Sequence, residues 1–162
     1  MKRILMFILI LSIGIIVSIQ SANASKPNIT IDDVKGKMPF EVLVPQISDK
    51  DWKLIVNPYS KNSENDPQVL GIHYVKNEDI MLSILESNSL VDGIGGIESD
   101  EAMIVDINGN KGYFAKWASP AKDQEGGSLV WIQGNTICRM VAFKLDEVEM
   151  IKYAKSMRSI NR

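Results

Sequence analysis

Apolar runs in the second half of the chain flank two turn signals, which predicts two β-hairpins. The first lies at 103–117 around Asn108-Gly109, and the second lies at 128–143 around Gly134-Asn135. Both dipeptides suit tight two-residue turns between antiparallel strands. A turn at 108–109 sets Asp106 opposite Lys111 and Ile104 opposite Tyr113. A one-residue slip to Gly109-Asn110 changes every pair, and the pattern leaves both registers open.

The second hairpin has apolar residues on both faces of its strands. Its turn pairs Trp131 with Cys138 and Leu129 with Met140, and these four residues share one uncharged side. We expect that side to face the core. The residues on the opposite side that form a candidate ligand or partner surface are Ile132, Ile137, Val141 and Phe143.

The first half predicts shorter elements. A short helix begins at Thr30, before two acids, and is limited by Gly36. Prolines flank a short edge strand or extended segment at 40–44, and another strand runs from Trp52 to a stop at Pro58. The segment at 69–75 is strand-like, whereas 80–87 fits a strand or a buried helix. We expect connections at 60–67 and 92–102.

The last segment predicts an amphipathic helix. Asp146 and Glu149 have the spacing of a capping box. An apolar stripe of Val148, Ile151, Ala154 and Met157 follows at three-residue intervals. The fold class is therefore α+β, with a largely antiparallel, curved sheet packed against this C-terminal helix and a short N-terminal helix.

The N-terminus has the pattern of a secretory signal peptide. Lys2 and Arg3 precede an uncharged apolar run at 4–19, and Ala22-Asn23-Ala24 supplies small residues for cleavage. The run is slightly short for a membrane span. We expect a signal peptide at 1–24 and one extracytoplasmic domain at 25–162, with no stable membrane span after cleavage. An uncleaved anchor is the alternative, and it would leave the domain membrane-associated.

Charge argues against a nucleic-acid partner. Of the 18 Lys and Arg residues, only Lys2 and Arg3 precede position 25, which leaves 16 against 20 Asp and Glu, a formal charge of −4. Nucleic-acid binding favours a basic face instead. The single cysteine excludes an internal disulfide, so packing must stabilise the domain.

Residues with catalytic chemistry are sparse. Cys138 would need a nearby base, and the single histidine is His73. Opposite Trp131 on an apolar face, this cysteine is interpreted as a packing residue. One His and one Cys with no regular acid spacing predict no metal site, and the glycines at 93–96 lack a phosphate-loop motif. We expect no cofactor and no catalytic residues, although a pair of carboxylates among the 20 acids would permit an exported hydrolase.

Three tryptophans raise one further alternative. Trp52, Trp117 and Trp131 could form a platform for carbohydrate, but tryptophans on strands more often pack in the core.

Several short motifs resemble the bacterial family called domain of unknown function 4367. Leu129 and Trp131 match its L-x-W strand, Ala154 and Ser156 match the A-x-S of its helix, and 40–45 resembles its F-x-V-x-x-P entry. The resemblance is densest at 103–157. It implies an exported or membrane-anchored extracytoplasmic module of Gram-positive bacteria, without catalytic residues. The order of elements is also similar to lipoprotein-carrier and envelope-stress sensor folds, which does not establish function.

These observations lead to a hypothesis of function. We expect a non-enzymatic, secreted cell-envelope module that binds an apolar ligand or lipid between sheet and helix. The alternative is a protein-interaction or regulatory module with an envelope protein as partner, and an exported hydrolase is less favoured.

Overall fold

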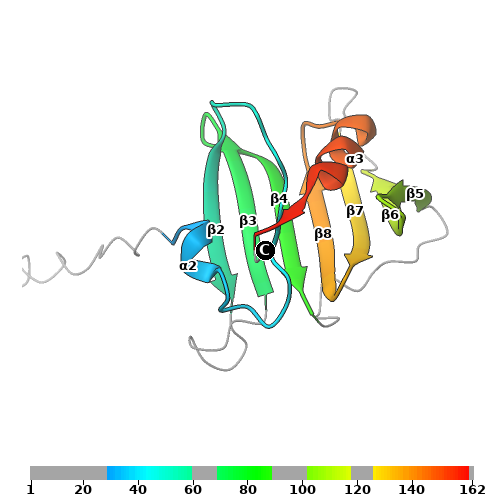
Figure 1. Cartoon of the computed structure of the whole chain (residues 1–162). Helices are drawn as coiled ribbons and strands as arrows, with labels where there is room; N and C mark the ends of the chain where they lie inside the picture. The colour runs from blue at the N-terminus through cyan, green and yellow to red at the C-terminus, as the bar shows by residue number, and fades with distance from the viewer. Residues whose placement is uncertain (1–28, 60–68, 89–101, 118–125, 161–162) are drawn as a thin grey trace, which may run out of the picture.

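A seven-stranded antiparallel sheet dominates the computed structural model, which describes residues 29–59, 69–88, 102–117 and 126–160 (Figure 1). Its strands are β2 (Lys53–Tyr59), β3 (Val69–Lys76), β4 (Asp79–Ser87), β5 (Met103–Ile107), β6 (Asn110–Lys116), β7 (Gly127–Gln133) and β8 (Thr136–Ala142). The other elements are α2 (Ile31–Val34), β1 (Leu43–Val44), α3 (Glu147–Ser156) and β9 (Arg158–Ser159). The α+β class and the antiparallel sheet are thus confirmed. The predicted signal peptide and the connections at 60–67 and 92–101 lie outside the described residues.

The strand order is β2-β3-β4-β8-β7-β6-β5, and every neighbouring pair is antiparallel. Two runs of consecutive strands, β2 to β4 and β5 to β8, therefore join where β4 meets β8. This junction pairs Glu86 with Cys138. The segment predicted as strand or buried helix is a strand, β4, in the interior of the sheet next to the central strand β8.

Both hairpins of the second half have the predicted register. Asp106 pairs with Lys111 and Ile104 with Tyr113, which selects the Asn108-Gly109 turn over its one-residue slip. Both turn residues have positive φ, 53° and 85°, as this tight turn requires. In the second hairpin Trp131 pairs with Cys138, and Gly134 takes the positive φ of 61°.

The helix α3 begins at the predicted cap. The Asp146 carboxylate accepts a hydrogen bond from the Glu149 backbone N–H at 2.8 Å, and the Glu149 carboxylate accepts one from the Asp146 N–H at 3.4 Å. The predicted apolar stripe is only partly right. Val148 is 72% exposed, whereas Met150 is fully buried. A strict three-residue interval drifts around a helix of 3.6 residues per turn, so a stripe drawn through Ala154 and Met157 leaves the core before it reaches Val148.

The predicted stop at Pro58 is also wrong. Pro58 lies inside β2, which continues to Tyr59. The strand is at the edge of the sheet, where a residue without an N–H is tolerated because one side of the strand needs no ladder partner.

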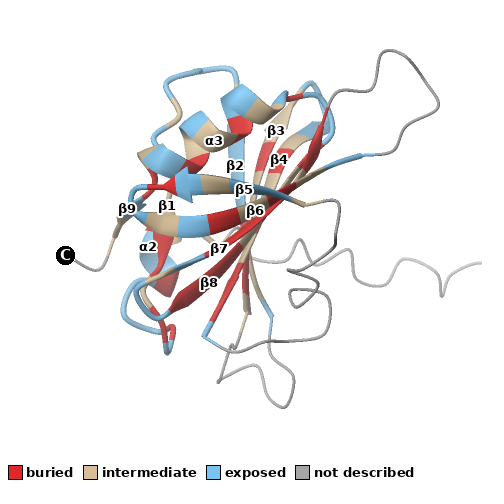
Figure 2. Ribbon diagram, turned by 90° about the vertical axis from the view of Figure 1, so that its right-hand side faces the viewer, coloured by how far each residue is buried: buried red, intermediate tan, exposed pale blue. Residues whose placement is uncertain are grey.

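One face of the sheet carries the core. Figure 2 shows α2, α3, β1 and β9 all on this side of the strands. Met150 and Ala154 of α3, and Met157 directly after the helix, belong to the same buried cluster as Trp131 and Met140 of the sheet. We call this the inner face.

The chain between α2 and β2 is fixed across the inner face by long-range hydrogen bonds. Thr136 Oγ1 donates to the Glu41 carbonyl at 2.5 Å, and the Glu41 N–H donates to Asn135 Oδ1 at 3.1 Å. Ile160 N–H then donates to the Val42 carbonyl at 3.1 Å, beside the pairing of β1 with β9. The two ends of the domain therefore meet over the sheet.

Candidate binding surface

The face of the seven-stranded sheet opposite α3, here called the outer face, is the candidate binding surface. Side chains alternate along each strand, so the neighbours of the buried Trp131, Cys138 and Met140 point outward. Among the described residues, no helix or further strand packs against this face (Figure 2).

Three of the four residues predicted as a ligand or partner surface, Ile132, Ile137 and Val141, point to the outer face, and Phe143 directly follows β8. Ile132 is 51% exposed and Phe143 is 55% exposed. Val141 is half-buried, and Ile137 is buried. Ile132 and Ile137 are direct partners across the β7–β8 pair.

The Phe143 side chain is held at one end of this face. Its ring stacks on Trp117, with 6.0 Å between ring centroids and 5° between planes. Trp117 is itself anchored, because its indole N–H donates to the Ala142 carbonyl at 2.9 Å. Two exposed aromatic rings therefore extend the apolar surface beyond the end of β8.

Uncharged side chains make up almost all of the outer face on the four central strands. The outward positions paired across β3, β4, β8 and β7 are Val69, Gly71, His73, Val75, Ser83, Leu85, Ser87, Ile137, Arg139, Val141, Ser128, Val130 and Ile132. Arg139 is the one permanent charge in this set. Gly71, Ser87, Val130 and Ile137 of this set are buried, so Ile132 is its most exposed apolar residue. Exposed apolar side chains of this kind can bind a ligand or partner.

His73 and Ser83 form the polar contact of the outer face. His73 Nδ1 and Ser83 Oγ are 2.9 Å apart on neighbouring strands. Partial burial lowers the pKa of His73 from its usual 6.5, because desolvation disfavours the charged imidazolium.

Cys138 and His73 do not form a catalytic pair. Cys138 is fully buried on the inner face, whereas His73 points to the outer face. Burial, followed by the charge of Glu86, raises the pKa of the thiol well above 9.0. A thiol with so little thiolate is a poor nucleophile, so the interpretation of Cys138 as a packing residue is confirmed by its burial.

A buried carboxyl, Glu86, was not singled out from the sequence. It is fully buried beside Cys138, and both of its oxygens lie 3.2 Å from the Leu43 backbone nitrogen, whose N–H donates to them. Burial raises its pKa well above 4.5, against a smaller lowering by that hydrogen bond. Leu82, Ile84 and Glu86 alternate on one face, so an acid in phase with two core residues was the available signal.

The Glu86 carboxyl joins two layers of the molecule. It belongs to β4, and its donor Leu43 belongs to β1. Tyr74 lies nearby on β3; burial, with the Glu86 charge as a smaller cause, raises its pKa to about 12. Since Tyr74 Oη donates to the Pro45 carbonyl at 3.4 Å, both polar groups attach the same segment to the sheet.

The three tryptophans occupy separate environments. Trp131 is buried at the inner face, and Trp52 packs between Tyr74 and Tyr153, at centroid distances of 6.1 and 5.7 Å. Trp117 follows β6, several strands away from Trp52, and stacks on Phe143. They therefore do not form a shared platform for carbohydrate.

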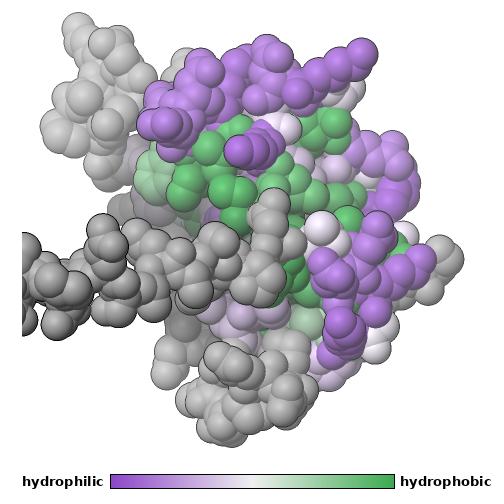
Figure 3. Space-filling model, turned by 90° about the vertical axis from the view of Figure 1, so that its left-hand side faces the viewer, coloured by the Kyte–Doolittle hydropathy of each residue, from purple (hydrophilic) through white to green (hydrophobic). Residues whose placement is uncertain are grey.

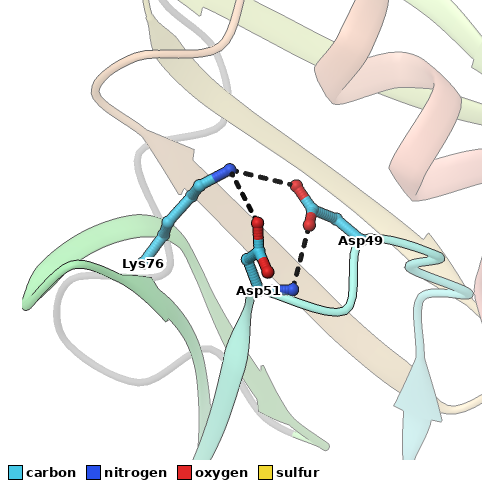
Figure 4. Close-up of polar contacts among 3 residues, drawn as sticks. All are labelled: Asp49, Asp51 and Lys76. Carbon is cyan, nitrogen blue, oxygen red and sulfur yellow. Dashed lines mark hydrogen bonds and ion pairs between the residues drawn. The ribbon is translucent and has the colours of Figure 1, made fainter.

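A charged cluster lies at the start of β2. Lys76 Nζ is 3.4 Å from Asp49 and 3.8 Å from Asp51, and the Asp51 N–H donates to Asp49 at 3.0 Å (Figure 4). Near it, a depression of about 470 Å³ is bordered by Trp52 and Ile55. These exposed pairs contribute little to stability and fix the local path of the chain.

Metal and membrane sites are not found in the described part of the chain. No three His, Cys, Asp or Glu side chains there are grouped to hold a metal ion. No helix in the same residues has the length and apolar character needed to cross a membrane.

The fold and the outer face define an α+β protein with an open antiparallel sheet. No family model matches the chain, and no curated protein matches it. A crystal structure from Bacteroides thetaiotaomicron VPI-5482 is similar over 67% of this chain and 42% of its own length, with 15% identity and a TM-score of 0.37. The chain thus spans less than half of that protein, and so distant a likeness carries no argument about function.

Proposed function

We propose that the chain is a non-enzymatic, exported module of the cell envelope that binds an apolar ligand on the outer face of its sheet. The observation that carries the proposal is the exposure of apolar side chains at both ends of β8. Ile132, the cross-strand partner of Ile137, is 51% exposed, and Phe143, which follows β8, is 55% exposed. Covering such side chains removes apolar surface from water, which favours binding by about 25 cal/mol per Å² buried.

The proposed site is the outer face because side chains fill the middle of the space between sheet and helix. A depression of about 170 Å³ remains at the start of α3, but charged Lys116, Asp146 and Glu147 border it. Met150 and Ala154 of α3, and Leu129 and Met140 of the sheet, are all fully buried. Interiors packed in this way accommodate an extra group only with strain. An apolar ligand therefore has more available surface on the side away from α3.

Export is proposed from the N-terminal sequence alone. The charged start, the apolar run and the small residues before position 25 have the order of a secretory signal. A module without disulfides or a metal cluster in its described part then depends on its packed inner face for stability.

An uncharged fluorescent probe, N-phenyl-1-naphthylamine, tests the proposed function. Its emission should rise on binding to the purified protein. Ile132→Ser or Phe143→Ser, according to the end of β8 that the probe occupies, should weaken binding about tenfold, because a buried side chain of this size contributes roughly 1.5–3 kcal/mol. Val148→Ser is the matched control, since Val148 is 72% exposed but lies on α3. Equal binding by all three variants would contradict the proposal.

The edge of β2 supports a second candidate, a protein-interaction module. Leu54 and Ile55 are each 36% exposed, and Tyr59 is 48% exposed. Figure 3 shows hydrophobic residues in the middle of this side of the molecule, with hydrophilic residues around them. An edge strand presents backbone donors and acceptors to which an extended segment of a partner can pair.

Photo-crosslinking in the native host distinguishes this candidate. A crosslinker at Ile55 should capture one defined envelope protein if β2 is the interface. A crosslinker at Lys152, which is exposed on α3, serves as the control position. The same products from both positions, or none from Ile55, would exclude the edge of β2.

A further inference from the structure

Arg139 lies in the middle of the outer face and is surrounded by apolar residues. Its partners across the neighbouring strands are Leu85 on β4 and Val130 on β7. Along β8, the next outward residues are Ile137 and Val141. Its guanidinium group therefore interrupts an otherwise uncharged surface.

The guanidinium of Arg139 has no partner within the described part of the protein. Its Nε is buried without a hydrogen-bond partner, and the ion pairs found there involve lysines only. Leaving a buried donor unsatisfied is unfavourable, most of all on a charged group. Arginine forms its strongest hydrogen bonds with carboxylate and phosphate oxygens, which match its planar fork.

One unpaired cation within an apolar surface is complementary to a ligand with one negative charge and an apolar chain. We propose that the outer face binds a long-chain fatty acid, with its carboxylate on Arg139 and its chain along β8 past Val141 toward Phe143. Phe143 follows Arg139 by four positions, about 13 Å at the usual rise of a strand. This inference rests on the proposed function and adds the chemical class of the ligand.

The surroundings of Arg139 favour a single carboxylate. A nucleic acid would need several cations, and the central strands offer one. Lys111 lies at the margin of the face, 4.8 Å above the Tyr113 ring, and Asp106 is its cross-strand partner. Since an acid neighbours Lys111, Arg139 is the better anchor for an anionic head.

Comparison of dodecanoate with 1-dodecanol isolates the charge of the head. The two ligands have equal chains, so any difference in affinity reports the carboxylate. We expect the purified protein to bind dodecanoate about tenfold more tightly, as one charge-assisted hydrogen bond implies. Isothermal titration calorimetry below the aggregation concentration of either ligand provides the measurement.

Three variants test whether Arg139 causes the preference for dodecanoate over 1-dodecanol. Arg139→Gln should bind both ligands equally, at the affinity that the unchanged protein has for dodecanol. Lys152→Gln, which removes a cation from α3, and Lys111→Gln should keep the preference. If Arg139→Gln does not fold, Arg139→Lys decides, because losing the planar fork should reduce the preference without abolishing dodecanol binding.

The possible results of these titrations distinguish failure of the fatty-acid inference from failure of the proposed function on which it rests. Equal binding of both ligands by the unchanged protein would overturn the inference and leave the apolar site standing. The inference would also be overturned if Arg139→Gln still bound dodecanoate more tightly than dodecanol, or if Lys111→Gln lost that preference. Binding of neither ligand would overturn both proposals, and a dimer in native mass spectrometry that Ile132→Ser dissociates would then assign the face to a second copy of the chain.

Discussion

At the scale of single residues, Glu86 couples proton binding to folding. Its carboxyl is fully buried, accepts the Leu43 N–H and has a pKa raised well above 4.5 by burial. The folded protein therefore keeps Glu86 protonated at pH values where the unfolded chain ionises it. Its contribution to stability is complete below pH 4.5 and is lost as the pH rises through the raised pKa of the folded state.

Glu86→Gln should remove this dependence on pH. For the unchanged protein, we expect Glu86 to lower the free energy of unfolding by up to about 1.4 kcal/mol per pH unit above pH 4.5. Glutamine keeps the shape and the acceptor without ionising. Urea unfolding between pH 4 and 8 provides the measurement, with Glu78→Gln in the exposed β3–β4 turn as the control. A slope unchanged by Glu86→Gln would contradict the account of this carboxyl.

The residues that are hard to predict from sequence are those whose partners lie far along the chain. The packing role of Cys138 followed from its pairing with Trp131 across a two-residue turn. Glu86 could not be interpreted in this way, because its partner Leu43 is 43 residues away. The unpaired state of Arg139 likewise depends on strands that only the fold brings together.

At the scale of elements, the orientation of α3 gives a direct test of its buried side. Met150→Ala should lower the free energy of unfolding by about 2–5 kcal/mol, because Met150 is fully buried and its loss leaves a cavity. Val148→Ala should change it by less than about 0.5 kcal/mol, since Val148 is 72% exposed. Denaturant titration measures both, and the reverse order of effects would show that the helix is rotated.

The cap of α3 gives a smaller prediction. Asp146→Ala removes the acceptor for the Glu149 N–H and should destabilise the protein by about 1 kcal/mol. Asp146→Asn, which keeps a good capping acceptor, should restore most of that loss. Thermal unfolding measures the stability of both variants. If Asp146→Ala and Asp146→Asn destabilise the protein equally, the loss of stability comes from the missing charge near the helix terminus and not from the cap.

Elements held by local signals were predicted closely. Both hairpins and the cap of α3 depend on residues within a few positions, so turn chemistry determined them. The predictions that were wrong concern features that depend on neighbouring elements of the fold. Pro58 continues a strand because β2 is an edge, and the stripe through Val148 failed because only packing shows which side of α3 is buried.

At the scale of the whole molecule, the pairing of β4 with β8 could not be predicted. It joins the two runs of strands, and residues such as Leu85 and Arg139 are more than 50 positions apart. Non-local pairing leaves no period in a sequence, although the antiparallel character of the sheet did follow from its hairpins. This junction creates the outer face, since it places β3 and β4 beside β8 and β7.

The central claim is that an apolar ligand binds the outer face, and an NMR titration with dodecanoate tests it most directly. Methyl resonances report each face separately. We expect shifts at Ile137 and Val141, which flank Arg139 on β8, while the methyl resonances of Met140 and Met150 on the inner side stay unchanged. Shifts confined to Met140 and Met150 would place the ligand between sheet and helix and contradict the account, as would a titration that moves no methyl resonance.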